Sequence, residues 1–464
     1  MNSVERKATA ILGAILVAQA AIHFFLLDDL FFNDEGHFLA YSWMAANGHV
    51  IYRDFFEHHP PLIEFLGAPV IALAGPSVEA LRLLSLAAAL LTTVCVFAAG
   101  RTLYGKKTAL ACAAGFALCA PLFFGFWFVT EPFLALAVAA GAALFLSWSR
   151  SRSAPALAVA GFAAGAALLL KPQAAALIIA LPFLLRAYRA KRMDYLVCLC
   201  SVAAPFLLAS LYFLANGALW QFVYYAYLFT VPNAAAVFLK LMPSGYYDFI
   251  LIAVAFIAAI PAALSLASRR STPDAFVLLV FLAASALFAF PRVDAFHFVP
   301  FLAPLSLALG GMHPGRWRGY LVGLVVFTAL AAWGTIILSL PANGQILHDH
   351  ATAAYLAAHT EPGERIFVAP FNPHLYAYAD REPATYRLTF GPYVLNRAAE
   401  EEAVAQLEAV QPKYVYFLNS TFEGETTQDY APVLYEYIFS HYDPVYFPSA
   451  PRTYEIVLVR MPGA

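Results

Sequence analysis

Long runs of apolar residues, separated by short polar turns, recur along the first 340 residues of the chain. A helix needs about 20 apolar residues to cross the roughly 30 Å hydrocarbon core of a bilayer. The pattern therefore predicts a polytopic α-helical membrane protein. Eleven spans are expected, at 8–27, 78–99, 108–124, 131–148, 155–170, 173–188, 194–215, 248–267, 274–290, 298–312 and 319–340.

A further apolar stretch at 62–75 is short and contains Gly67 and Pro69. We interpret it as a re-entrant or interfacial segment, with a twelfth span as the alternative, so about 11–12 transmembrane helices are expected. The first run, 8–27, is long enough to span the membrane, and no small-residue cleavage pattern follows it. It is therefore expected to be a retained helix and not a signal peptide.

The basic residues predict an orientation, because Lys and Arg accumulate in short cytoplasmic loops. If the spans alternate, fifteen of the 27 basic residues share one side, and eleven acidic residues before residue 341 fall on the other. The N-terminus is then cytoplasmic and the C-terminus extracytoplasmic. The basic side carries Arg6, Lys7, Arg101, Lys106, Lys107, Arg150, Arg152, Arg186, Arg189, Lys191, Arg192, Arg269, Arg270, Arg316 and Arg318.

The composition supports a membrane protein, since 62% of the residues are apolar and only 12% are charged. Soluble domains have about a quarter of their residues charged. A net charge of −2 without a basic run gives no indication of a nucleic-acid partner. All five cysteines lie in apolar segments, so neither disulfides nor a cysteine metal site is expected.

The composition changes after residue 340, with fifteen acidic residues between Asp349 and Glu455. A membrane domain at 1–340 is therefore expected to precede a small extracytoplasmic domain at 341–464. Strand patterns alternate with helical ones, which predicts an α/β fold. The strands are expected at 365–369, 413–418 and 454–460, and the helices at 345–358, 397–410 and 428–440. No catalytic motif is recognised in this domain.

Two predicted outer loops are long, at 28–77 and 216–247. The second loop is dense in aromatic residues, which suits an amphipathic segment lying on the membrane. Such a segment would form either an ordinary aromatic belt or a wall for a lipid-linked substrate. Its aromatic residues are Trp220, Tyr224, Tyr225, Tyr227, Phe229, Phe238, Tyr246 and Tyr247.

The first outer loop carries the candidate catalytic carboxylates, Asp34 and Glu35. A carboxylate in a partly shielded cavity can act as general base toward a hydroxyl. Adjacent carboxylates point in different directions, so only one would face the reaction. We assign Asp34 as the base and Glu35 to structure or metal binding, with a solvated surface pair as the alternative.

Glu57, His58 and His59 directly precede Pro60-Pro61, a pair that holds an extended backbone and ends any helix. Carboxylates and neutral imidazoles bind divalent cations such as Mg, Mn or Zn, whereas protonated imidazoles pair with phosphate. Spacing alone does not select between these. Glu57 and His58 are candidate metal ligands, and His59 is a candidate substrate contact.

Other ionisable residues occur in short turns predicted on the same side: Glu131, Lys171, Arg292 and His297. Cations there would suit the phosphate of a substrate, and a carboxylate would suit a transferred proton. We assign these four residues to substrate binding. The alternative is that Arg292 pairs with Asp294 and that Lys171 snorkels to the interface.

These motifs resemble those of integral-membrane glycosyltransferases of the GT-C superfamily, in particular protein O-mannosyltransferases and aminoarabinose transferases. The resemblance covers the membrane part, and it is most specific in the first outer loop. An outward C-terminal α/β domain is also found among such enzymes. The matching features are Asp34-Glu35, the stretch from Gly48 and Tyr52 to Pro60-Pro61-Leu62, Thr130-Glu131-Pro132, Leu170-Lys171-Pro172 and Pro291 to His297.

The resemblance implies transfer of a sugar from a polyprenyl-phosphate donor to an acceptor hydroxyl at the outer face of the membrane. The acceptor would be a lipid, a glycan or a protein. A single displacement, inverting the anomeric carbon, is implied, with Asp34 as general base, Glu57 as a metal or sugar contact, and Tyr52 in substrate binding.

His59 departs from the pattern of the family. Relatives often carry a lysine directly before the first proline of the Pro-Pro pair, where it can meet the carrier phosphate. In this chain Lys171 or Arg292 would supply that charge, or a metal ion on Glu57 and the neighbouring histidines.

Two other classes of function are compatible with many apolar spans. A transporter or lipid-linked sugar flippase is disfavoured, because no internal repeat is visible and the polar residues gather at one face. A membrane scaffold with a partner-binding outer domain is the other alternative. Short loops and an Ala-rich composition suggest a bacterial inner-membrane protein.

Overall fold

The computed structural model describes two compact units of the chain. The first unit comprises 1–29, 82–212 and 237–341, and the second comprises 30–81, 213–236 and 342–464. The described residues are 3–27, 33–229, 246–269, 272–290, 293–312, 319, 323–324, 326, 328–330, 332–333, 345–419, 421–422, 424–445 and 455–462.

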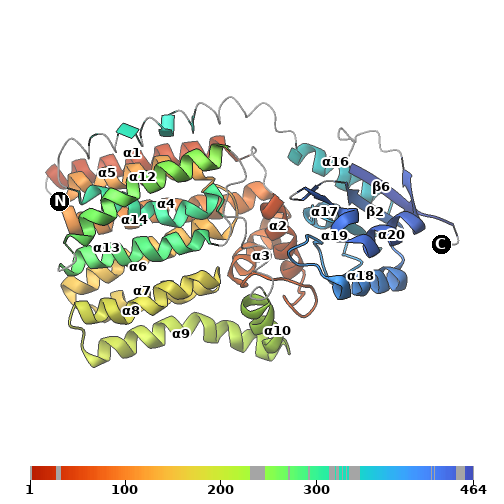
Figure 1. Ribbon diagram of the computed structural model, residues 1–464, viewed down its shortest axis with the longest axis horizontal. Coiled ribbons are helices and arrows are strands. Elements are labelled where there is room, and N and C mark those ends of the chain that lie inside the picture. Colours follow the sequence, from red (N-terminus) through yellow and green to blue (C-terminus); the bar gives the residue numbers. More distant parts are fainter. Residues whose placement is uncertain are drawn as a thin grey trace. The chain divides into compact units, whose positions relative to one another are not determined.

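Helices that lie side by side make up the first unit (Figure 1). They correspond to the first ten predicted spans, while the span predicted at 319–340 lies largely outside the described residues. The helices are α1 (Ser3–Phe25), α4 (Val78–Tyr104), α5 (Lys106–Cys119), α6 (Thr130–Ser151), α7 (Ala154–Leu168), α8 (Ala175–Ala187), α9 (Arg192–Ala215), α12 (Tyr246–Ala267), α13 (Pro273–Ala286) and α14 (Val299–Gly310).

Six helical stretches of the described residues are long and apolar enough to cross a membrane. They confirm that the protein is a polytopic helical membrane protein. The remaining apolar helices have 10–17 residues, because breaks such as Leu169 to Lys171 separate them from the next helix. The six stretches are Glu5–Phe25, Val78–Tyr104, Lys106–Phe123, Thr130–Ser151, Arg192–Ala215 and Tyr246–Ala267.

Small residues let the helices of this unit approach closely. Gly161 and Gly165 stand four apart on one face of α7, and both meet α9. A Cβ atom at Gly165 would lie 2.1 Å from the Val202 carbonyl oxygen, so glycine is required there. The hydrophobic effect does not favour helix association within lipid, because lipid tails are as apolar as the side chains. Close backbone packing of this kind stabilises the association instead.

The second unit contains two helices where an outer loop was predicted. These are α2 (Asn33–Ala46) and α3 (Leu62–Ala74), which pack against each other. α3 corresponds to the apolar stretch predicted at 62–75 as a re-entrant or interfacial segment, whereas α2 was not predicted, because a helix that is buried all round has no amphipathic signature. Residues 35–44 of α2 are all buried.

A four-stranded sheet forms the C-terminal part of the second unit, with strand order β1-β2-β6-β5. β1 (Phe367–Ala369) and β2 (Tyr414–Leu418) are parallel, while β6 (Glu455–Arg460) pairs antiparallel with β2 and β5 (Tyr442–Val445). The three strands predicted from the sequence are confirmed, and β5 was missed. A two-stranded ribbon joins β3 (Thr421–Phe422) and β4 (Glu425–Thr426).

Helices α18 (Arg397–Val410) and α20 (Pro432–His441) contribute Leu407 and Ile438 to the buried core against this sheet. The predicted helix at 428–440 is interrupted at Ala431, before Pro432, which separates α19 (Thr427–Tyr430) from α20. Helix α16 (Gln345–Ala358) was predicted, whereas the short α17 (His374–Ala379) was not. Helix α17 packs against α2.

Candidate functional site

Helix α2 places the two candidate catalytic carboxylates in its first turn. Acidic side chains are favourable there because the N-terminal end of a helix carries partial positive charge. Asp34 is exposed, while Glu35 is fully buried, so the adjacent carboxylates face different surroundings. Of the two, Asp34 is the carboxylate that a substrate in solution can reach.

The turn after α2 shapes the approach to Pro60-Pro61. Gly48, with φ +89°, adopts the left-handed conformation that glycine favours, and the Val50 N–H donates to Asp54 Oδ2 at 2.7 Å. The Tyr52 hydroxyl then donates to the carbonyl oxygen of His59 at 2.6 Å. The predicted substrate contact Tyr52 is itself buried, and it fixes the backbone of His59.

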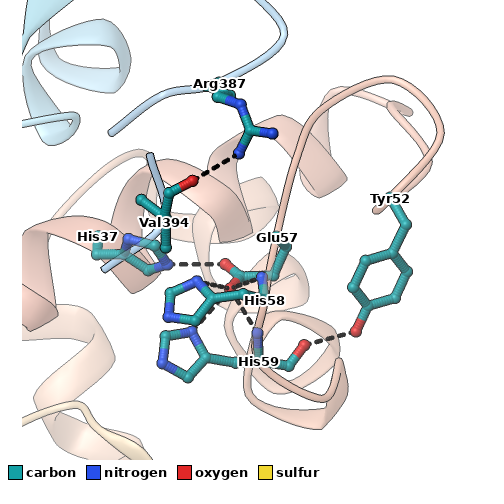
Figure 2. Close-up of polar contacts among 7 residues, drawn as sticks. All are labelled: His37, Tyr52, Glu57, His58, His59, Arg387 and Val394. Atoms are coloured by element: carbon teal, nitrogen blue, oxygen red, sulfur yellow. Dashed lines mark hydrogen bonds and ion pairs between the residues drawn. The ribbon is translucent and has the colours of Figure 1, made fainter. Parts of the chain in front are cut away.

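Glu57 is the centre of a partly buried polar cluster, which we name the Glu57 cluster: His37, Glu57, His58 and His59 (Figure 2). Its Oε1 accepts from the backbone N–H groups of His58 at 2.6 Å and His59 at 2.7 Å, and it contacts His59 Nδ1 at 2.7 Å. Oε2 contacts His37 Nε2 at 2.7 Å. One carboxylate therefore holds α2 and the loop before Pro60 together.

The electrostatics of the cluster follow from this geometry. Burial opposes ionisation of Glu57, but the charges and hydrogen bonds of His37 and His59 outweigh it and hold the pKa of that carboxyl well below its usual range. Burial, followed by the charge of His59, lowers the pKa of His58 well below its usual value. The cluster therefore combines a carboxylate with a neutral imidazole.

The donor set of the Glu57 cluster fits a divalent cation. The four candidate ligand atoms lie within 4.8 Å of one another, and three imidazoles with one carboxylate match zinc chemistry. His58 Nδ1 is buried without a hydrogen-bond partner among the described residues, 3.4 Å from Glu57 Oε1. That is close to the roughly 3.3 Å between two ligands of a tetrahedral zinc ion. The 2.7 Å contacts of His37 and His59 would have to lengthen by about 0.6 Å.

A segment of the C-terminal region, residues 386–394, packs onto the loop that carries this cluster. The Phe56 N–H donates to the Tyr386 carbonyl oxygen at 2.9 Å, and the Tyr386 hydroxyl donates to the Tyr52 carbonyl oxygen at 2.5 Å. Val394 joins Phe56 in a small apolar cluster. The C-terminal region, in which no motif was recognised, therefore forms part of the surroundings of the Glu57 cluster.

Arg387 is the cation of this segment. Its guanidinium carbon lies 4.0 Å above the centre of the Phe56 ring, and its Nη1 donates to the Val394 carbonyl oxygen at 3.3 Å. Figure 2 shows Arg387 and Val394 together with the Glu57 cluster. Its charge also contributes to the low pKa of His58, after burial and His59.

A second polar cluster lies in the first unit, and we name it the Glu131 triad: Glu131, Lys171 and His297. Lys171 Nζ donates to Glu131 Oε1, which also contacts His297 Nδ1 at 2.7 Å, and Lys171 Nζ lies 3.0 Å from the same ring nitrogen. The side chain of Glu131 is 2% exposed and that of Lys171 is 15% exposed. Lys171 is thus paired with a buried carboxylate and does not simply snorkel.

The structure brings most of the predicted site residues into two groups. In the second unit the grouped residues are Tyr52, Glu57, His58 and His59, and in the first unit they are Glu131, Lys171 and His297. Arg292 lies outside the described residues. No role was predicted for His37 or Arg387, although His37 stands three residues after Asp34 on the same helix.

The aromatic stretch of the second predicted loop also packs in the second unit. α10 (Leu219–Val223) and the π-helical turn Tyr224–Leu228 bring Phe222 and Tyr225 beside Tyr52, with ring centroids 5.9 and 6.5 Å away. Trp220 is 67% exposed. Phe222 and Tyr225 therefore pack against the first loop at Tyr52. Residues 230–245 of the predicted amphipathic segment lie outside the described residues.

Comparison with protein families gives one match. Residues 58–212 match the family model described as dolichyl-phosphate-mannose-protein mannosyltransferase. Comparison with curated protein sequences finds no match.

Solved structures give matches over nearly the whole chain. ArnT from Cupriavidus metallidurans bound to undecaprenyl phosphate has 16% identity and a TM-score of 0.64, over 98% of this chain and 99% of that chain. The Archaeoglobus fulgidus oligosaccharyltransferase tethered to an acceptor peptide has 15% identity and a TM-score of 0.56, over 97% and 74%. The oligosaccharyltransferase AglB from the same organism, with an inhibitory peptide and a dolichol-phosphate, has 15% identity and a TM-score of 0.55 over the same shares.

Proposed function

We propose that the chain is an integral-membrane glycosyltransferase of the GT-C superfamily, as its motifs predict, and that it transfers a sugar from a polyprenyl-phosphate donor to an acceptor hydroxyl. Undecaprenyl phosphate and dolichol-phosphate are bound by proteins of similar fold, which supports a lipid-phosphate donor. The acceptor is proposed to be a lipid, a glycan or a peptide. One similar structure carries an acceptor peptide.

The observation that carries the proposal is the position of Asp34 on α2. Asp34 and His37 stand three residues apart, so they are neighbours on the helix surface. His37 is bound to Glu57, and Asp34 is exposed. An accessible carboxylate thus lies beside a partly buried cluster whose side chains suit a metal ion or a phosphate.

The proposed reaction is a single displacement at the anomeric carbon. The acceptor oxygen forms a bond to that carbon while the bond from the carbon to the phosphate oxygen breaks, and the electron pair leaves with the polyprenyl phosphate. Asp34 takes the proton of the acceptor hydroxyl. Cationic groups aimed at the phosphate stabilise the charge that develops on the leaving group. Attack from the face opposite to the phosphate inverts the configuration of the sugar.

Two groups of residues, one in each unit, are alternative candidates for the phosphate contact. His59 is the most exposed member of the Glu57 cluster, with 32% of its side chain accessible. Lys171 carries the positive charge of the Glu131 triad, where Glu131 holds the ammonium group in place. Either group supplies charge-assisted hydrogen bonds to a phosphate oxygen.

A divalent cation is proposed as cofactor, held by His37, Glu57 and His58. When bound, the cation supplies positive charge for a phosphate. The protein residues prepare such a site, since Glu57 is ionised and His58 is neutral, the protonation states that a metal requires. Zinc fits this nitrogen-rich donor set better than magnesium, which prefers oxygen ligands.

The membrane arrangement completes the proposal. The distribution of basic residues supports a cytoplasmic N-terminus, with the C-terminal domain at 341–464 on the outer side, and the short loops and Ala-rich composition support a bacterial inner membrane. Asp34 and the Glu57 cluster would then face the outer compartment, where lipid-linked sugars are delivered to their acceptors.

Sugar transfer by the purified full-length chain tests the proposal. We expect Asp34→Asn to lower turnover by roughly 100-fold or more, in the range of lost general-base catalysis, while Asp443→Asn, an exposed control in the second unit, leaves it unchanged. The assay follows a radiolabelled sugar from polyprenyl phosphate into covalent product. Unchanged turnover in Asp34→Asn would remove the assigned base. Movement of the intact lipid-linked sugar across the membrane, without a new glycosidic bond, would instead indicate a flippase.

A further inference from the structure

Arg387 has fewer partners than a buried guanidinium normally needs. The residue is 8% exposed, and among the described residues it makes one hydrogen bond, from Nη1 to the Val394 carbonyl oxygen at 3.3 Å. Its buried Nε has no hydrogen-bond partner there. The Glu402 carboxylate lies 4.0 Å from Nε and is 46% exposed. Most of the donors of Arg387 therefore remain available.

The cost of burying this charge indicates that something else stabilises it. Removing a cation from water is costly unless it is well paired, and a half-exposed carboxylate at 4.0 Å offsets little of that cost. The Phe56 ring beneath the guanidinium supplies a cation–π contact, but this contact gives the N–H donors of Arg387 no acceptor. An anion bound to the unused donors would complete the pairing.

The backbone on either side of Arg387 is fixed to the first loop. Tyr386 makes two hydrogen bonds to that loop, through its carbonyl oxygen to Phe56 and through its hydroxyl to Tyr52. Val394, the acceptor of the Arg387 hydrogen bond, packs against Phe56. The guanidinium is thus held in place before any ligand binds, which lowers the entropic cost of binding.

None of the four side chains of the Glu57 cluster is a lysine or an arginine. His37 and His59 both direct a ring nitrogen at Glu57, so each of these imidazoles is paired with that carboxylate. Both His58 and Arg387 lie near the Phe56 ring. The rings of His58 and Phe56 are nearly parallel, with an interplanar angle of 11° and centroids 6.1 Å apart. Arg387 is therefore the cation of the second unit that lies beside the cluster and is not matched by a close carboxylate among the described residues.

We propose that Arg387, supplied by the C-terminal domain, binds the phosphate group of the lipid-linked donor. The planar guanidinium matches two phosphate oxygens, which an ammonium group cannot do. This inference rests on the proposed function, because it takes the lipid phosphate as the ligand. It gives the C-terminal domain a direct part in substrate binding.

Binding of undecaprenyl phosphate to the full-length protein in nanodiscs tests the proposal. We expect Arg387→Met to weaken it by roughly 10- to 100-fold, the effect of losing charge-assisted hydrogen bonds. Binding of uncharged undecaprenol should change less than twofold, and Arg387→Lys should give an intermediate loss. Arg397→Met is the matched control, because Arg397 is exposed and pairs only with its helical neighbour Glu401 among the described residues. Inorganic phosphate is added as a competitor of undecaprenyl phosphate. Competition would show that the site binds free phosphate, and no competition would show that it binds phosphate only when a lipid is attached.

Three outcomes decide against the inference. Equal affinity of wild type and Arg387→Met for undecaprenyl phosphate would overturn it while leaving sugar transfer intact. Equal losses for the phosphate and the uncharged alcohol would show a purely structural residue. If wild type does not distinguish the phosphate from the alcohol, the proposed lipid-phosphate donor fails as well. Should Arg387→Met not fold, as judged by its unfolding temperature, unchanged binding by Arg387→Lys overturns the two-oxygen contact.

Discussion

Glu57→Gln tests whether one carboxylate organises the candidate site. The substitution keeps the shape of the side chain and removes its charge. The amide oxygen can keep the three contacts now made to Oε1, and the amide nitrogen can donate to His37 in its other tautomer. Glu57→Ala would instead remove the acceptor of four donors, one of them buried and three part-buried, and the protein could then unfold, so that a local effect could not be measured.

The magnitude follows from the four hydrogen bonds. Bonds to a charged group contribute about 1.5–3 kcal/mol, roughly twice the neutral value, so neutralising the acceptor weakens the four bonds together by about 3–6 kcal/mol. Relief of the desolvation of Glu57 offsets part of this. The pKa of Glu57 lies below its usual value, so the attractive contacts outweigh burial and the net effect is destabilising. We expect a loss of about 2 kcal/mol from the free energy of unfolding.

The assay is thermal unfolding of the full-length protein in detergent at a fixed scan rate. The second unit has about 200 residues, and in that size range 1 kcal/mol shifts Tm by about 2–4 °C. The expected drop in Tm is therefore about 4–8 °C. The control is Glu382→Gln, which removes an exposed carboxylate paired with His49 and Arg365 and should shift Tm by about 2 °C or less. A drop below 1 °C for Glu57→Gln, or an equal drop in the control, would refute the central role of Glu57.

Three further predictions concern the metal ion, the Glu131 triad and the ion pair between Arg53 and Asp54. Elemental analysis of purified protein should find His58→Ala at least tenfold poorer in bound divalent metal than wild type, with His49→Ala unchanged; equal metal in both would place the ion elsewhere. Lys171→Met should lower kcat/KM for the lipid-linked donor by roughly 10- to 100-fold, with the exposed Lys413→Met as control, and an unchanged value would leave the triad structural. The hydrogen bond from Arg53 holds the pKa of Asp54 below its usual value, so its stabilisation is present above about pH 4 and is lost at lower pH. Asp54→Asn should therefore lower Tm by a few degrees at most at pH 7, and the difference from wild type should vanish below pH 4; a constant difference would contradict this assignment.

Local patterns predicted the parts of the fold that depend on local physics. Apolar runs marked the helices from α1 to α14 in the first unit, because each must be apolar along its length to lie in lipid. Buried strands such as β2, with all five residues buried, were equally visible. Helix α2 was not, since a helix surrounded by protein needs no polar face and carries no periodic signal.

Adjacency in sequence also determined part of the candidate site. Glu57, His58 and His59 are consecutive, so any compact turn brings them together, and their residue types alone suggested a metal or a phosphate. The sequence likewise predicted that Glu131, Lys171 and His297 lie on one side of the membrane. Their direct contact around one carboxylate oxygen was decided by the packing of three separate helical segments.

Only the tertiary structure could add His37 and Arg387. His37 joins the Glu57 cluster because α2 begins at Asn33, which aims that side chain at a loop 20 residues further on. Arg387 reaches Phe56 across more than 300 residues of sequence, through the hydrogen bonds of Tyr386. Composition and periodicity depend on residues that are neighbours along the chain. A charge supplied by a distant segment depends instead on the tertiary packing of the whole second unit.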